Sequence, residues 1–244
     1  MLRNIVSQLA GSVRRHGAGG TARLAGGMLA HGWFDLRHGT DTMAWVELDA
    51  LDIASGNKRR GTRYAPTIAR PLRRLLAALA LPRDALFIDL GCGKVRVLLL
   101  ALEHGFSRVA RVEFSAELCA IARRNLARFR PRGGSSDGSQ VWHGDAAEYE
   151  FAAVDSVVYL NNPFDAEVLG RVLDRLERLL AEHPVRVWLI YHDPVHRAAI
   201  ERRNRWEPVG DFPLGLYGFA VYRTRKREGA AFDGQGRISF PGSA

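Results

Sequence analysis

Three carboxylic acids stand at the ends of successive short apolar segments. Asp89 ends the first segment, Glu113 the second and Asp145 the third, and Glu113 comes 20 residues after Gly93. Gly91 and Gly93 form a turn directly after the first segment. Glycines let a backbone turn sharply and approach a bound molecule, and a helix that follows such a turn presents free N–H groups to a ligand. If the segments are parallel strands, the acids meet at one sheet edge, which predicts a ligand site there.

The types of these acids favour S-adenosylmethionine (SAM) over a dinucleotide. The sulfonium and ammonium groups of SAM are cations that suit Asp89, the ribose hydroxyls suit Glu113, and the adenine amine suits Asp145. A dinucleotide turn needs a small residue at its third glycine position, where this chain has Arg96. A nicotinamide-dependent oxidoreductase is therefore the less favoured alternative.

The elements that must position these residues follow from the alternation of apolar segments and helical periods. Alternating strands and helices predict an α/β fold with a parallel sheet covered by helices on both faces. The last two strands lack a helix between them, which predicts an antiparallel hairpin. We expect strands over 85–90, 108–114, 140–143, 156–160, 186–191, 206–212 and 217–222, and helices over 68–79, 94–104, 116–130, 166–182 and 195–203.

With these motifs in place, residues 63–224 resemble the class I SAM-dependent methyltransferases. The motifs that carry the resemblance are Asp89-Leu-Gly-Cys-Gly93, Val112-Glu113-Phe114, His143-Gly-Asp145-Ala146 and Asn161-Asn-Pro-Phe164. The resemblance implies a Rossmann-like fold with a seven-stranded, mostly parallel sheet and an antiparallel C-terminal hairpin. It also implies that Ala146 and Asn161 belong to the cofactor site.

A closer likeness is to bacterial methyltransferases of unassigned substrate that carry a Tyr-x-Pro-Thr segment before the first strand. These are distantly similar to the lysine methyltransferases that lack a SET domain, in which this segment helps close over SAM. The likeness makes Tyr64 and Thr67 expected cofactor contacts.

The loop after the fourth strand is similar to the [DNS]-P-P-[YF] loop of amino-group methyltransferases. The resemblance implies that a polar side chain and a proline carbonyl accept hydrogen bonds from an amine, and that an aromatic ring stacks on it. We expect Asn162 in the polar role, followed by Pro163, with Phe164 as the stacking ring. His192, at the end of the fifth strand, is an alternative base or substrate contact.

One residue departs from the family pattern D-x-G-x-G-x-G, because Val95 replaces the last glycine. A valine at the mouth of the turn would narrow the cofactor pocket. If Val95 instead lies in the following helix and points away, the change is harmless, and we expect this second arrangement. A catalytically degenerate scaffold protein with the methyltransferase fold is the alternative that the first arrangement would support.

The net charge of +9 is unevenly distributed. Residues 1–80 hold 12 Lys and Arg against 5 Asp and Glu, residues 223–244 hold 5 against 2, and residues 81–222 hold 18 against 19. The basic ends permit nucleic acid as a methyl acceptor, but no nucleic-acid-binding module is evident. The favoured partner is a protein or small-molecule acceptor that the sequence does not specify.

The expected organisation is a basic N-terminal extension over 1–62, the methyltransferase domain over 63–224 and a polar C-terminal tail over 225–244. A short basic amphipathic helix over 2–15 is one possibility within the extension. Two cysteines form no disulfide framework, no metal-ligand spacing occurs and no apolar run is long enough for a membrane span. We therefore expect a cytoplasmic protein without a bound metal; the oligomeric state is not predicted.

Overall fold

The computed structural model describes residues 32–43, 66–130, 139–214, 218–225, 231–232 and 238–239. Tyr64, the possible helix over 2–15 and most of the C-terminal tail lie outside the described residues. A helix over residues 32–38 comes first in the described chain. The later helices are α2 (Ala69–Ala78), α3 (Arg96–Glu103), α4 (Ala116–Arg128), the 3₁₀ helix η3 (Ala146–Glu148), α5 (Ala166–Glu182) and α6 (Ala198–Glu201).

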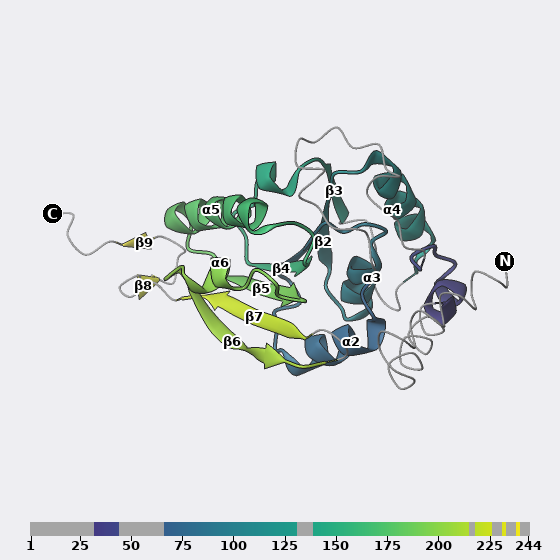
Figure 1. Cartoon of the computed structure of the whole chain (residues 1–244), viewed down its shortest axis with the longest axis horizontal. Coiled ribbons are helices and arrows are strands. Elements are labelled where there is room, and N and C mark those ends of the chain that lie inside the picture. Colours follow the sequence, from purple (N-terminus) through teal and green to yellow (C-terminus); the bar gives the residue numbers. More distant parts are fainter. Residues whose placement is uncertain are drawn as a thin grey trace, which may run out of the picture.

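Seven strands form the central sheet, in the order β3-β2-β1-β4-β5-β7-β6 (Figure 1). The five strands from β1 to β5 pair in parallel, and β7 pairs antiparallel with both β5 and β6. This arrangement confirms the predicted α/β fold with its antiparallel C-terminal hairpin. The strands are β1 (Leu86–Leu90), β2 (Arg108–Glu113), β3 (Ser139–His143), β4 (Ser156–Asn161), β5 (Val187–His192), β6 (Trp206–Phe212) and β7 (Phe219–Thr224), and β8 (Ala231–Phe232) pairs separately with β9 (Ile238–Ser239).

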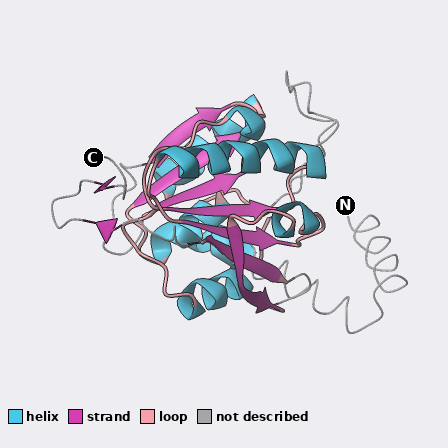
Figure 2. Ribbon diagram, turned by 90° about the vertical axis from the view of Figure 1, so that its left-hand side faces the viewer, coloured by secondary structure: helices cyan, strands magenta, loops and turns pink. Residues whose placement is uncertain are grey.

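Helices cover both faces of the sheet (Figure 2). Alternate β1 residues divide between two apolar clusters: Phe87 packs with α2, α3 and α4, whereas Ile88 packs with η3, α5 and α6. Burial on both faces explains why β1 is fully buried along its length. The sheet therefore has one carboxyl edge at which β1 to β5 all end.

Side-chain caps define where two of the helices begin. The Ser115 hydroxyl accepts a hydrogen bond from Leu118 N at the start of α4, and the Asp165 carboxylate accepts from Glu167 N and Val168 N at the start of α5. Both caps come directly after the carboxyl edge, so they set how the chain leaves the region of the predicted site.

Two predicted helices begin later than expected. Helix α3 starts at Arg96 and not at Lys94, because Val95 has φ +66° and cannot be part of a right-handed helix. Helix α6 covers only Ala198–Glu201, because residues 195–197 form turns after Asp193, whose φ is +49°.

Candidate active site

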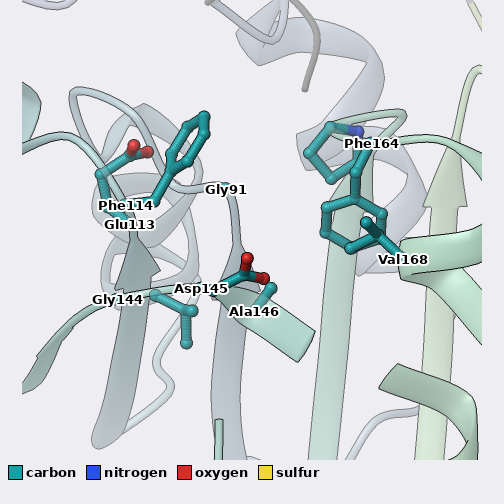
Figure 3. Close-up of a pocket in the computed structure, with 10 residues that line it drawn as sticks. Gly91, Glu113, Phe114, Gly144, Asp145, Ala146, Phe164 and Val168 are labelled. Atoms are coloured by element: carbon teal, nitrogen blue, oxygen red, sulfur yellow. The ribbon is translucent and has the colours of Figure 1, made fainter. Parts of the chain in front are cut away.

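A pocket opens at the carboxyl edge of the sheet, where β1, β2, β3 and β4 end (Figure 3). Six of the residues predicted for the site line it: Gly91, Glu113, Asp145, Ala146, Pro163 and Phe164. The remaining lining residues are Val112, Phe114, Gly144 and Val168. The structure thus gathers segments from four strands around a single cavity.

The glycine turn after β1 passes close to the loop after β4. Gly91 has φ +73°, and a Cβ built on it would lie 2.6 Å from the Cβ of Pro163. Both Gly91 N and Cys92 N donate to the carbonyl of Val112, at 2.9 and 3.1 Å. Only glycine fits this position, since any side chain would be strained by φ and would collide with the proline.

Glu113 joins the second strand to the glycine turn. Its Oε2 accepts a hydrogen bond from Gly93 N at 2.8 Å, and its Oε1 accepts from Ser115 N at 3.0 Å. Burial raises the pKa of Glu113 to about 7, although these backbone N–H groups favour the ionised form. A carboxylate has about four lone-pair sites in all, and backbone N–H groups of Ser115, Gly93 and Phe114 interact with this one, so acceptor capacity remains for a ligand.

Asp89 lies beside the pocket without lining it. Its side chain is 3% exposed, and burial together with the neighbouring charge of Glu113 raises its pKa well above the usual range for an aspartate. The register of the sheet places Asp89 opposite Tyr159 of β4. The structure therefore puts this acid in the buried core, on the strand position next to Tyr159.

Thr67, which precedes α2, connects to the end of β4. Its hydroxyl lies 3.0 Å from the hydroxyl of buried Tyr159 and accepts from Nδ2 of Asn161 at 3.3 Å. Thr67 and Asn161 thus contact each other across 94 residues of sequence. Neither residue lines the pocket. Their hydrogen bond instead fixes the start of the loop after β4, because Asn161 is the last residue of that strand.

Asp145 caps the short helix η3 and faces the pocket. Its Oδ1 accepts from Ala147 N at 2.9 Å. The preceding residue, Gly144, has no room for a side chain, because a Cβ there would lie 2.6 Å from the Trp142 ring. Capping fixes the direction of the Asp145 carboxylate at the pocket wall.

The loop Asn161–Phe164 is held from a neighbouring strand. The hydroxyl of Tyr191, on β5, donates to Oδ1 of Asn162 at 3.1 Å and accepts from His196 N at 3.3 Å. Asn162 itself has φ +42°, a conformation that asparagine tolerates better than most residues. Phe164 is 7% exposed, lines the pocket beside Val168 (Figure 3) and also belongs to the apolar cluster that contains α5.

Two site residues were not singled out by the sequence. Phe114 follows Glu113 directly and stands beside it on the pocket wall (Figure 3); its place at a strand end, within a motif already recognised, was the signal for it. The sequence predicts Tyr191 to be a core aromatic, and its side chain is 1% exposed. Its hydroxyl nevertheless donates a hydrogen bond to Oδ1 of Asn162. Nothing in its local sequence distinguishes it from an ordinary buried tyrosine.

Val95 does not narrow the pocket. It precedes α3 instead of lying within it, and its fully buried side chain packs in the cluster around α2, α3 and α4. It keeps the left-handed backbone that suits glycine, but its side chain does not line the pocket. At the described pocket, Val95 therefore gives no support to the degenerate alternative.

His192 is a buried residue of the β5 end. Its ring stacks on Phe219 with centroids 4.4 Å apart, and burial lowers its pKa to about 4, so it is neutral at pH 7. It does not line the described pocket. Within the described ranges, no group of three or more His, Cys, Asp or Glu side chains could hold a metal, and no helix is long and apolar enough to cross a membrane.

Comparisons with known proteins agree with this geometry. Residues 88–183 match a family model described as a methyltransferase domain. A putative RNA methyltransferase from Pyrococcus horikoshii has a similar structure, with TM-score 0.50 and 21% identity over 73% of this chain and 95% of its own. A glycopeptide N-methyltransferase solved with SAM has TM-score 0.50 and 13% identity over 63% of this chain and 92% of its own. A comparison with curated protein sequences gave no match.

The sheet order, the glycine turn and the strand-end acids define a Rossmann-like fold of the methyltransferase type. Residues 88–183, which lie within this fold, match a methyltransferase domain, so over this part the chain is similar to the class I SAM-dependent methyltransferases.

Proposed function

We propose that this enzyme transfers the methyl group of SAM to an amine nitrogen, either of a protein lysine or of a small molecule. The observation that carries the proposal is the close approach of the glycine turn and the Asn161–Phe164 loop, which meet at Gly91 and Pro163. Gly91 and Pro163 both line the pocket, which supports a site shared by the expected cofactor turn and the expected acceptor loop.

The residues around the pocket fit SAM. Gly91 leaves a space that a Cβ would fill, Glu113 has lone pairs for ribose hydroxyls, and Asp145 has a fixed carboxylate for an adenine amine. The exposed part of Phe114 offers an aromatic face against which a flat base packs favourably. When bound, SAM would supply an electrophilic methyl group on its sulfonium, with S-adenosylhomocysteine as the leaving group once the C–S bond is broken.

The chain's part in the transfer is to orient the acceptor and keep water away. The Asn162 side chain is held by Tyr191, so it is already placed before an acceptor arrives. We infer that Asn162 and the carbonyl of Pro163 accept from the acceptor amine, and that the Phe164 ring packs against it. Thr67, bonded to Asn161, and Tyr64 complete the cofactor side of the site in this proposal.

RNA is the second candidate acceptor. Arginines are exposed on α2 and α4, on the face of the sheet opposite α5, and exposed arginines suit a phosphate backbone. They are Arg70, Arg73, Arg74, Arg123, Arg124 and Arg128.

Both described cysteines are free and buried, which favours a reducing, cytoplasmic location.

A thermal-shift titration with SAM, S-adenosylhomocysteine and NAD tests the cofactor. A ligand present at 100 times its Kd should add about 2.7 kcal/mol of stability. We expect a shift with the first two ligands and none with NAD. The absence of a shift with both SAM and S-adenosylhomocysteine at millimolar concentration would overturn the proposal.

Methyl-tritiated SAM tests the acceptor, with lysine-containing peptides, small primary amines and RNA oligonucleotides as separate arms. We expect label in an amine arm, and an Asn162→Ala enzyme should lose about 100-fold in kcat while its Kd for SAM is unchanged. Arg223→Gln is the matched control, because Arg223 lies on β7 with its side chain exposed and paired to Glu207. Label in RNA alone would instead favour the second candidate.

A further inference from the structure

Residues 32–43, which we call the N-terminal strap, pack against the methyltransferase core. Phe34 of the strap is 3% exposed and belongs to the apolar cluster around α2, α3 and α4. His38 packs between Phe34 and Phe129, with ring centroids 4.7 and 4.8 Å away, and Gly39 O accepts from Arg128. Residues 32–43 lie within the expected basic extension, and Phe34 packs in this apolar cluster.

One buried side chain joins the strap to the cofactor turn. Asn125 of α4 is 1% exposed, and its Oδ1 accepts from Asp41 N at 2.8 Å. Its Nδ2 donates to Asp41 O at 2.9 Å and to Lys94 O at 3.0 Å. Lys94 directly follows Gly93, whose N–H donates to Glu113. A single amide group therefore binds the backbone of the strap and the backbone of the glycine turn.

Two ion pairs join the same parts of the chain. The ammonium of Lys94, which is 3% exposed, lies 3.2 Å from Oδ1 of Asp41. The guanidinium of Arg96, which is 2% exposed, lies 3.6 Å from Oδ1 of Asp35 and 4.5 Å from the centroid of the Phe34 ring. Both cations stand at the start of α3, where the positive end of the helix disfavours them. Nearby carboxylates lower the cost of burying such charges.

The strap is itself organised to present these carboxylates. Asp35 accepts hydrogen bonds from the Thr40 hydroxyl at 2.7 Å, from Thr42 N at 2.9 Å and from the Thr42 hydroxyl at 2.7 Å. These bonds close the chain after the helix over 32–38 into a compact turn. Asp41, between the two threonines, is thereby brought against Asn125 and Lys94.

We propose that the strap is part of the cofactor-binding machinery, with Asn125 and Asp41 as positioning residues that hold the Gly93–Arg96 backbone in its ligand-binding form. The inference rests on the proposed SAM function of this pocket. The strap holds Lys94, Lys94 adjoins Gly93, and Gly93 holds the Glu113 carboxylate at the pocket wall. Because coupling between two sites is reciprocal, SAM binding strengthens strap docking as much as strap docking strengthens SAM binding.

Two strap variants and one control test this coupling in the full-length protein. Asn125→Ala removes three hydrogen bonds, whereas Asp41→Asn removes the charge of the ion pair and keeps the backbone bonds to Asn125. A buried hydrogen bond contributes a factor of about two to ten. We expect the Kd for SAM, measured by isothermal titration calorimetry, to rise about tenfold or more in Asn125→Ala and about threefold in Asp41→Asn. Arg223→Gln should leave it unchanged.

Hydrogen exchange measures the reciprocal effect. Saturating SAM should slow exchange of the Asp41 and Thr42 amides in the wild type, and slow it less in Asp41→Asn. If both strap variants lower Tm but bind SAM with wild-type affinity, and SAM leaves the strap amides unchanged, the strap is only structural and the inference is wrong. If the wild type binds neither SAM nor S-adenosylhomocysteine, the proposed function fails as well, so the two failures are distinguishable.

Discussion

The backbone of Val95 allows a quantitative test of the glycine turn. Val95 has φ +66° and ψ +18°, and its side chain is fully buried. A left-handed backbone costs a residue with a side chain about 1–2 kcal/mol relative to glycine. Replacing Val95 by glycine removes this cost, but it also removes buried methyl groups.

The two effects can be separated by comparing Val95→Ala with Val95→Gly. Val95→Ala keeps the left-handed cost and deletes two buried methyl groups, so it should destabilise by about 1.5–2.5 kcal/mol. Going from alanine to glycine deletes one more carbon and frees the unfolded chain, which together cost about 1–1.5 kcal/mol. Relief of the left-handed backbone offsets that cost, so the two variants should have nearly equal free energies of unfolding.

Val97 provides the matched control. It lies inside α3 with right-handed helical geometry and is 5% exposed. There glycine should be less stable than alanine by about 1 kcal/mol. Urea denaturation of the four variants gives the two alanine-to-glycine differences, and subtracting one from the other isolates the left-handed cost at Val95.

The reasoning is refuted if the alanine-to-glycine difference is the same at both positions. Equality would mean that the backbone at Val95 gains nothing from glycine and is not held in the left-handed region. Since Val95 does not line the pocket, we also expect Val95→Gly to bind SAM within twofold of the wild type.

Three further predictions concern the pocket. Gly91→Ala should destabilise by about 2–5 kcal/mol in urea denaturation, because the new Cβ meets Pro163 at φ +73°; an unaffected Cm would contradict this. The pKa of Glu113 is raised to about 7 in the folded state from its ordinary 4.5, so the folded state binds a proton that the unfolded state has released. Through this group, stability should fall by about 3 kcal/mol as pH rises from about 4.5 to 7. Glu113→Gln should make the slope shallower and leave the part that the raised pKa of Asp89 contributes. Tyr191→Phe removes the hydrogen bond that holds Asn162 and should lower kcat toward an amine about tenfold with an unchanged Kd for SAM; a change in Kd alone would show that Tyr191 acts on the cofactor side.

The strand and helix pattern was largely predictable from the sequence, because it depends on residues close together along the chain. Apolar segments with two-residue or near-four-residue periods identify strands and helices before any packing is known. The errors lie at helix starts. Helix α3 begins after Val95 because the backbone there is left-handed, and valine is a residue type that does not predict a left-handed backbone. The available sign of this left-handed backbone was that Val95 occupies a position at which the resembled family has glycine.

The strand-end acids were predictable as a group, but their individual bonds were not. A carboxylate at the end of a parallel strand must lie at the ligand edge, which explains why Glu113 and Asp145 line the pocket. That Glu113 bonds Gly93 N while Asp89 remains beside the pocket depends on how β1 and β2 pair and on which face each side chain occupies.

The sequence by itself determined the methyltransferase fold class, the glycine turn and the loop Asn161–Phe164. Only the tertiary structure decided that the strap packs on the core, that Asn125 binds both Asp41 and Lys94, and that Tyr191 holds Asn162. The reason is physical: turns and periodicity arise from neighbours in the chain, whereas Asp41 and Asn125 lie 84 residues apart. Contacts over such a separation exist only after the helices have packed, because packing alone decides which buried polar groups meet.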